Sequence, residues 1–190
     1  DGVGRYVAAE LAAEGARVVV SDWNAEGGEQ TVAEIKRDGG DAIFVKTDVS
    51  QEDQVEAMVR AAVDTYGGLH VLYNNAGVWF ISQHGYIPGT TDAPSPLLTQ
   101  NIWDTTINVN LKGTYLSCKY GIPAMIASGG GAILNVSSVA ALRVGRGASD
   151  AYTASKGGVM AMTRTLAVEH AVHNIRCNCI FPGPIETPMV

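Results

Sequence analysis

The sequence predicts an α/β fold in which helices cover both faces of a parallel sheet. Two observations lead to this prediction: short apolar runs of strand length recur along the chain, and stretches of helical character separate them. This order buries both faces of a sheet only when the strands are parallel and the crossovers right-handed. We therefore expect a doubly wound parallel sheet in one domain over residues 1–190, a length that allows a sizeable core.

Five apolar runs are the expected strands, most of them buried on both faces. They cover residues 17–22, 42–46, 69–74, 132–137 and 175–180. The clearest helix follows the second run, because apolar residues at 55, 58, 59, 62 and 63 recur at the spacing of one helix face. Ser50 and Asp53 predict a capping box at its start.

Composition and charge narrow the classes of function. The net charge of -6 and the lack of a basic block argue against nucleic acid as a partner. The uncharged stretch 120–142 contains proline, glycine and asparagine, so we expect no membrane span. The three cysteines are interpreted as reduced, and no ligand cluster accompanies His170 and His173, so we expect no metal. Without a signal-like start, the predicted location is cytoplasmic.

Residues that follow the strands predict a dinucleotide site, because the ligand crevice of such a sheet lies beyond the carboxyl ends of its strands. Gly2-Val3-Gly4 opens a helical pattern, where backbone can approach a pyrophosphate. Asp22 ends the next strand, where a carboxylate would accept ribose hydroxyls and repel a 2'-phosphate. With no basic residue in 23–26, NAD is favoured over NADP. The alternative for Asp22 is a helix N-cap.

Two later strand ends extend this series. Asp48-Val49 is expected near the adenine, and Asn75-Ala76-Gly77, after the run 69–74, would let backbone approach the ribose. Each of these segments could equally be an ordinary turn. Their common register is what favours a cofactor crevice.

Tyr152 and Lys156 are the candidate catalytic pair, since i,i+4 spacing places them on one helix face. A lysine charge would lower the pKa of the phenol from about 10 towards working pH. The phenol could then act as general acid or base while hydride moves between a nicotinamide cofactor and a carbinol or carbonyl carbon. Ser138, 14 residues before Tyr152, could hold the substrate oxygen, and Ser137 is the less favoured candidate.

These motifs, together with Asn108-Val109-Asn110 and Pro182-Gly183, resemble the short-chain dehydrogenase/reductase family over essentially the whole chain. The resemblance implies a Rossmann-type fold, a small alcohol or ketone substrate, and a homodimer or homotetramer. It implies that Asn110 binds a water linking Lys156 to a proton relay, and that Lys156 also holds the nicotinamide ribose. It further implies that Ile185 and Thr187 meet the carboxamide.

The chain also departs from the family pattern. It begins at the last two glycines of the cofactor turn and stops before a substrate-covering segment, so we expect a partial domain that lacks its first strand and carboxyl-terminal elements and folds poorly alone. The loop 78–100 is longer than usual. With its Trp79, Phe80, His84 and Tyr86 it either shapes the substrate pocket or is a surface insertion.

Two other functions compete with hydride transfer. A sugar-nucleotide epimerase or dehydratase also uses Tyr and Lys, but the spacing of Gly2-Val3-Gly4 argues against that group. A non-catalytic NAD-binding fragment would be expected to lose Ser138, Tyr152 or Lys156, and all three are present.

Overall fold

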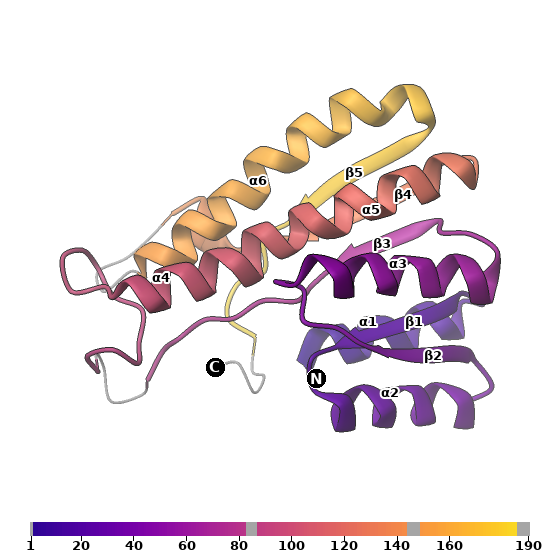
Figure 1. The fold of residues 1–190 in the computed structure, drawn as a ribbon, viewed down its shortest axis with the longest axis horizontal. Coiled ribbons are helices and arrows are strands. Elements are labelled where there is room, and N and C mark those ends of the chain that lie inside the picture. Colours follow the sequence, from indigo (N-terminus) through magenta and orange to yellow (C-terminus); the bar gives the residue numbers. More distant parts are fainter. Residues whose placement is uncertain (1, 83–86, 144–148, 186–190) are drawn as a thin grey trace.

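The computed structural model describes residues 2–82, 87–143 and 149–185 (Figure 1). The amino-terminal half contains α1 (Gly2–Ala13), β1 (Arg17–Asp22), α2 (Ala25–Arg37), β2 (Asp41–Lys46), α3 (Glu52–Tyr66) and β3 (Val71–Asn74). The other half contains α4 (Gln100–Ile107), α5 (Gly113–Ala127), β4 (Gly131–Val136), α6 (Asp150–His170) and β5 (Ile175–Ile180). Three short turns complete it: the π-helical η1 (Asn108–Lys112) between α4 and α5, and the 3-10 turns η2 (Val139–Ala141) and η3 (Ala171–His173).

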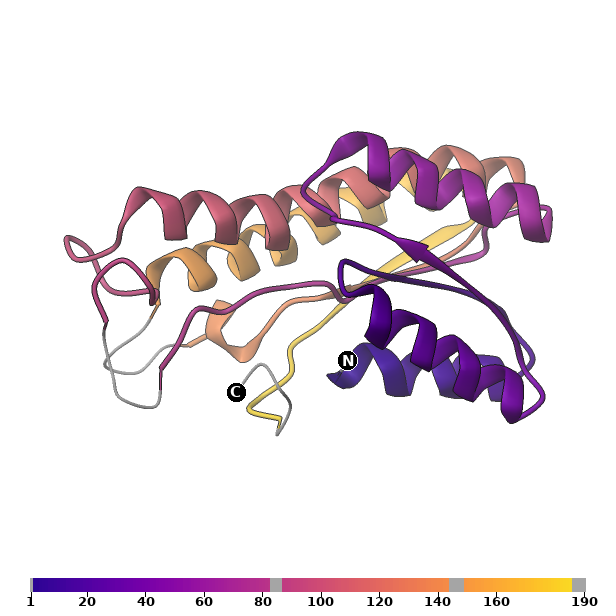
Figure 2. The ribbon, with the colours of Figure 1, turned by 60° about the horizontal axis from the view of Figure 1, so that its bottom comes forward.

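All strand pairs are parallel, and the helices lie on both faces. β1 pairs with β2, and β3, β4 and β5 pair in that order. Helices α1 and α2 pack together on one face, whereas α3, α5 and α6 lie on the other (Figure 2). The predicted doubly wound α/β architecture is confirmed, and each of the five expected strands forms within two residues of its expected bounds.

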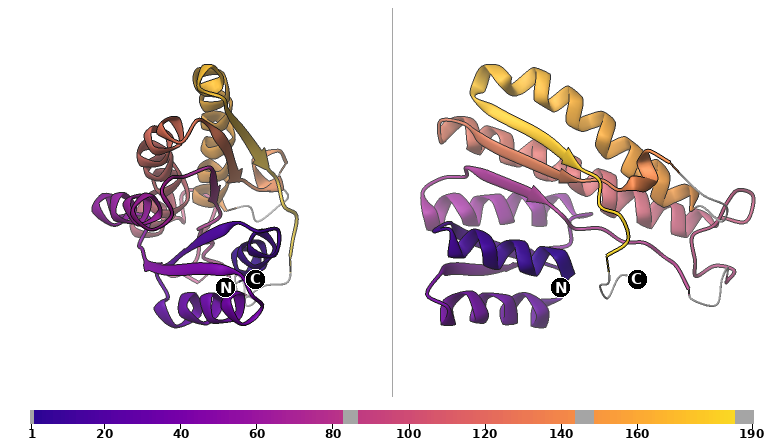
Figure 3. Two further views of the ribbon diagram at one scale, coloured as in Figure 1. Left: turned by 90° about the vertical axis from the view of Figure 1, so that its right-hand side faces the viewer. Right: turned by 180° about the vertical axis from the view of Figure 1, so that it is seen from behind.

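The strands form two parallel sheets. Within the described residues, β1 pairs only with β2 and β3 only with β4, and the two sheets lie side by side (Figure 3). Helix α3 joins them, since it packs against β1, β2 and α5. The expectation that most strands are buried on both faces is wrong, since no described strand is buried along its whole length and residues 18–22 of β1 are only half-buried.

Each sheet has its own apolar core. The core of the larger sheet consists of Leu72, Cys118, Ile122, Met125, Ile133, Ile175 and Cys177. The smaller core, between α1, α2 and the two-stranded sheet, consists of Ala12, Val32, Ile35 and Ala42. All three cysteines are free thiols, as expected.

The predicted capping box of α3 is wrong. The helix begins at Glu52, its N-cap is Gln51, and no side chain caps it. Ser50 lies before the N-cap and donates its backbone N–H to Asp48 Oδ1 at 2.9 Å, while the N–H of Asp48 is bound by Gln54 Oε1 at 2.8 Å. The carboxylate of Asp48 closes a turn of its own after β2, and this turn moves the start of the helix along the chain.

Candidate active site

Tyr152 and Lys156 come together at the carboxyl edge of the larger sheet. Tyr152 lies in the first turn of α6 and Lys156 one turn later, beside the end of β4. Lys156 is only 4% exposed, and its Nζ donates to the carbonyl of Val136 at 2.9 Å. The same Nζ lies 5.7 Å from the centroid of the Tyr152 ring. The last residue of β4 therefore helps to set the position of the ammonium group.

The titration of these two groups follows from their burial. Burial lowers the pKa of Lys156 to about 8, with a smaller opposing influence of Cys179. Burial also raises the pKa of Tyr152, and the Ser138 side chain opposes this increase. The expectation that Lys156 lowers the pKa of the phenol is therefore wrong in this structure, because the ammonium group is directed to a backbone carbonyl and desolvation dominates at the phenol.

Two consecutive serines after β4 have different surroundings. Ser138 is close enough to Tyr152 to affect the pKa of its phenol, and its Oγ accepts the N–H of Ala140 at 3.2 Å. Ser137 is 2% exposed and donates its hydroxyl to the carbonyl of Lys156 at 2.8 Å. Ser137 thus fixes the backbone of α6 to β4, whereas Ser138 is placed beside the phenol.

Asn110, in the π-helical turn η1, forms hydrogen bonds to segments on either side of the candidate site. It is 1% exposed, its Oδ1 accepts the N–H of Val78 at 2.7 Å, and its Nδ2 donates to the carbonyl of Val78 at 2.9 Å. Nδ2 also lies 3.1 Å from Ser155 Oγ. The side chain therefore ties the exit of β3 to α6, and the water-binding role implied by the family resemblance stays a prediction.

Gly77 explains how these elements approach one another. A Cβ atom at this position would lie 3.3 Å from Asn110 Oδ1 and 3.4 Å from Lys156 Nζ. Both atoms thus face the backbone that follows β3. The absence of a side chain brings the β3 exit, η1 and α6 to a common point.

The glycine-rich start meets the end of β3. Gly2, Val3 and Gly4 form the first turn of α1, and a Cβ at Gly4 would lie 2.8 Å from Asn75 Nδ2. Two of the predicted cofactor-binding segments are therefore adjacent. Ala76 follows Asn75 and is exposed at the same edge.

Asp22 ends β1, as the sequence predicts, and its Oδ1 accepts the N–H of Asn24 at 3.0 Å. Asn24 is the N-cap of α2, since its side chain accepts the N–H of Gly27 at 3.3 Å. The helix N-cap alternative for Asp22 is therefore wrong. The carboxylate instead belongs to the strand exit at the edge where the other predicted cofactor residues lie.

The remaining predicted residues are more scattered. Val49 packs against Gly113, where an added Cβ atom would lie 2.7 Å from Val49 Cγ2. The carbonyl of Pro182 accepts the N–H of Val139 at 3.1 Å, which links the β5 exit to the Ser138 turn. Gly183 and Ile185 are exposed beyond β5, and Thr187 lies outside the described residues.

The segment between β3 and α4 supplies contacts that the sequence did not indicate. The Trp79 ring stacks on Tyr152 with centroids 5.1 Å apart, and Trp79 Nε1 donates to Ser149 Oγ at 3.0 Å. Asp92 accepts the N–H of Tyr152 at 2.8 Å. Neither Asp92 nor Ser149 was singled out, although a serine directly before a helical pattern is a recognisable N-cap signal. His84 and Tyr86 of the same segment lie outside the described residues.

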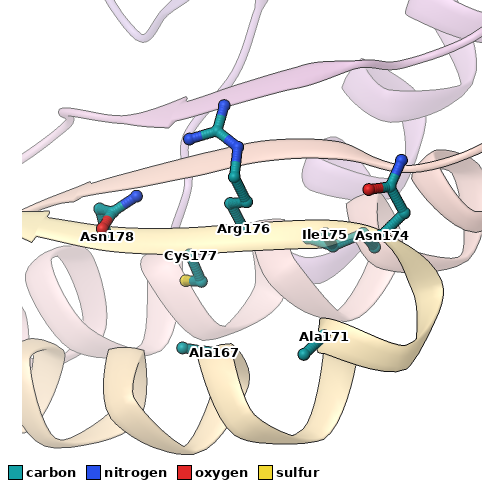
Figure 4. Close-up of a pocket in the computed structure, with 7 residues that line it drawn as sticks. All are labelled: Ala167, Ala171, Asn174, Ile175, Arg176, Cys177 and Asn178. Carbon is teal, nitrogen blue, oxygen red and sulfur yellow. The ribbon is translucent and has the colours of Figure 1, made fainter.

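A second region of the described structure is hollowed at its surface. A hollow of about 440 Å³ lies at the amino-terminal end of β5, away from Tyr152, and is lined by residues 167, 171 and 174–178 (Figure 4). Among the described residues, no group of three or more His, Cys, Asp or Glu side chains could hold a metal ion. No helix in that part of the chain has the length and hydrophobicity needed to span a bilayer.

Comparison with known proteins decides the family. The family model described as short chain dehydrogenase matches residues 1–190. The chain belongs to the short-chain dehydrogenase family. It is 38% identical over 189 residues to cyclohexanol dehydrogenase of Acinetobacter sp. (strain SE19), covering 100% of this chain and 71% of that protein. It is likewise 38% identical over 189 residues to 2-(R)-hydroxypropyl-CoM dehydrogenase of Xanthobacter autotrophicus, covering 99% and 72%.

Solved structures agree with this assignment. The crystal structure of a 3-ketoacyl-ACP reductase from Sinorhizobium meliloti 1021 matches with a TM-score of 0.88 and 37% identity, covering 98% of this chain and 70% of that one. The short-chain dehydrogenase described here is thus an oxidoreductase acting on CH–OH groups, with the Rossmann-type fold that the sequence predicts.

Proposed function

We propose that this short-chain dehydrogenase transfers hydride between NAD(H) and a secondary alcohol or ketone, with Tyr152 as the general acid and base. The observation that carries the proposal is the convergence of Tyr152, Lys156 and Ser138 at one edge of the sheet. The pKa values of Tyr152 and Lys156 are both perturbed by burial. Such a cluster is typical of an acid–base site.

The residues at this edge fit a dinucleotide. Two glycines keep backbone accessible at this edge. A Cβ atom at Gly4 would crowd the side chain of Asn75, and one at Gly77 would crowd Asn110 and Lys156. We propose that the first turn of α1 binds the pyrophosphate, with Asp22 accepting the adenosine ribose hydroxyls. The other predicted contacts come from Asp48, Val49, Asn75, Ala76, Gly77, Pro182, Gly183, Ile185 and Thr187. When bound, the nicotinamide accepts or supplies the hydride.

The proton of the substrate hydroxyl would be transferred to and from residues of this chain. In the oxidation, Tyr152 takes the hydroxyl proton while the C–H bond breaks and its electron pair leaves as hydride, which forms the ketone. Ser138 holds the substrate oxygen beside the phenol. Lys156 is protonated below its pKa of about 8, keeps its ammonium group on the carbonyl of Val136, and would hold the nicotinamide ribose. In the reduction, Tyr152 returns the proton.

The competing functions lack such support. A non-catalytic NAD-binding fragment has no need for Tyr152, Lys156 and Ser138 to converge. The relatives reported above are named as dehydrogenases and a reductase, and none as an epimerase. The homo-oligomeric state and the cytoplasmic location stay predictions.

A substrate panel tests the proposal. The full-length protein is assayed with NAD and secondary alcohols that include cyclohexanol, followed by NADH absorbance, beside Tyr152→Phe and Tyr66→Phe. Tyr66 is the matched control, since its hydroxyl contacts Asp41 on the other sheet. We expect Tyr152→Phe to lower kcat by at least about a thousandfold, on the scale of a lost general base, with Tyr66→Phe unaffected. Near-normal turnover by Tyr152→Phe would refute the mechanism.

A further inference from the structure

We propose that Asp92 is a positioning residue for Tyr152, which it holds by capping α6 from the segment between β3 and α4. This inference rests on the proposed function of Tyr152. It assigns a purpose to the described parts of the segment between β3 and α4, residues 78–82 and 87–99, of which the second part reaches the first turn of α6 (Figure 1).

Both carboxylate oxygens of Asp92 are directed to the start of the helix. Oδ2 accepts the N–H of Tyr152 at 2.8 Å, and Oδ1 accepts the N–H of Ala151 at 3.3 Å as well as that of the neighbouring Ala93 at 2.8 Å. The first turn of a helix leaves such N–H groups without partners, and its partial positive charge favours a carboxylate there. Asp92 is 7% exposed, so water gives little competition for these bonds.

The side chain at the N-cap position of α6 does not cap the helix. Ser149 stands at the N-cap position of α6, yet its side chain makes no capping bond. Its Oγ instead accepts the indole N–H of Trp79 at 3.0 Å. The same segment therefore removes the local cap through Trp79 and replaces it with Asp92, a residue more than fifty positions earlier in the chain.

Further contacts fix the segment against the helix. Asp92 donates its own N–H to the carbonyl of Phe80 at 2.7 Å, which sets the carboxylate relative to Trp79. Asp150 Oδ2 accepts both the N–H and the hydroxyl of Ser95 at 2.9 Å. Because Trp79 stacks on the ring of Tyr152 while Asp92 holds its backbone, the segment constrains the phenol at two points.

Loss of the carboxylate would free the first turn of α6, where Tyr152 lies. The phenol would then spend less time beside Ser138, while the cofactor-binding residues on α1 and β1 would be untouched. Positioning errors of this kind lower turnover rather than cofactor affinity. A merely structural role would instead lower both with the fraction of folded protein.

The test compares Asp92→Ala, Asp92→Asn and Asp64→Ala in the full-length protein. Asp64 is an exposed acid on α3 and serves as the matched control. We expect Asp92→Ala to lower kcat about tenfold, the effect of one lost cap on the population of competent enzyme, with the dissociation constant for NAD within about twofold of wild type. Asp92→Asn keeps an acceptor oxygen and is expected to recover most of kcat. Asp64→Ala is expected to match wild type.

Three results would overturn the proposal: unchanged kcat in Asp92→Ala, NAD affinity that falls together with kcat, or no recovery in Asp92→Asn. If Asp92→Ala does not fold, amide hydrogen exchange of Asp92→Asn decides. Because Asp92→Asn keeps an acceptor but loses the charge, we expect exchange in residues 149–154 to be about twofold faster than in wild type and that in 131–136 to be unchanged, and unchanged protection of both would contradict the proposal. Failure of the proposed function is seen separately, as normal turnover by Tyr152→Phe.

Discussion

Replacing Lys156 by methionine is expected to stabilise the protein while abolishing its activity. Lys156 is 4% exposed, and burial lowers its pKa from 10.5 to about 8. A folded-state pKa below the unfolded value means that protonation favours the unfolded chain. The penalty is therefore complete below pH 8 and disappears as the pH rises towards 10.5.

The size of the effect follows from the two pKa values. At about 1.4 kcal/mol for each pKa unit, the buried charge costs about 3 kcal/mol at pH 7. Methionine has a similar length and no charge, but it leaves the carbonyl of Val136 without this donor, which costs about 1 kcal/mol. The expected net gain is about 2 kcal/mol, or roughly 4–8 °C in Tm for a chain of this size.

Urea denaturation of the full-length wild type and Lys156→Met, without cofactor and at equal concentration, measures this difference. At pH 7 the variant is expected to be more stable. By pH 10 the gain is expected to vanish or reverse, because little of the penalty is left there. Lys46→Met, on the exposed end of β2, is the control, and we expect no gain from it. A variant that is less stable at pH 7, or a gain that does not shrink with pH, would refute the reasoning.

Three other expectations concern the cofactor, the backbone and the assembly. Asp22→Ala is expected to raise the ratio of kcat/KM for NADP to that for NAD by about tenfold or more, since a charge that repels the 2'-phosphate is removed. Replacement of the exposed Glu26 by alanine is the control and is expected to leave this ratio unchanged. The same ratio in Asp22→Ala as in wild type would count against the NAD assignment. Gly131→Ala is expected to unfold the protein or to lower its free energy of unfolding by at least about 3 kcal/mol, because φ is +155° and the new Cβ would lie 2.0 Å from the His70 carbonyl oxygen. Gly157→Ala in α6 is the control, since a Cβ there meets open space, and chemical denaturation is expected to show a slightly more stable protein. Light scattering of the full-length protein is expected to give a dimer or tetramer, and a monomeric mass would contradict that prediction.

Local sequence patterns were enough to predict most of the fold. The strands at 17–22 and 175–180 form as expected because runs of apolar and β-branched residues suit a sheet wherever it lies. The start of α3 was predicted incorrectly, because Asp48 and Gln54 make competing side-chain bonds that residue spacing does not reveal.

The candidate site shows the same limit. The pairing of Tyr152 with Lys156 could be predicted because i,i+4 spacing fixes their relation within one helix. The direction of the Tyr152 pKa could not, since it depends on burial by distant segments and on where the Lys156 ammonium group is directed. Asp92 gave no signal at all, because its partners lie about sixty residues away in sequence.

By itself the sequence determined the order of the elements, the family resemblance and the side chains available for acid–base chemistry, because these depend on residue type and short-range spacing. The tertiary structure decided that Gly77 brings Asn110 and Lys156 together, that Trp79 covers the Tyr152 ring, and that a remote carboxylate caps the helix. These contacts join segments far apart in the chain. Their desolvation and hydrogen bonding depend on the packing of the whole fold.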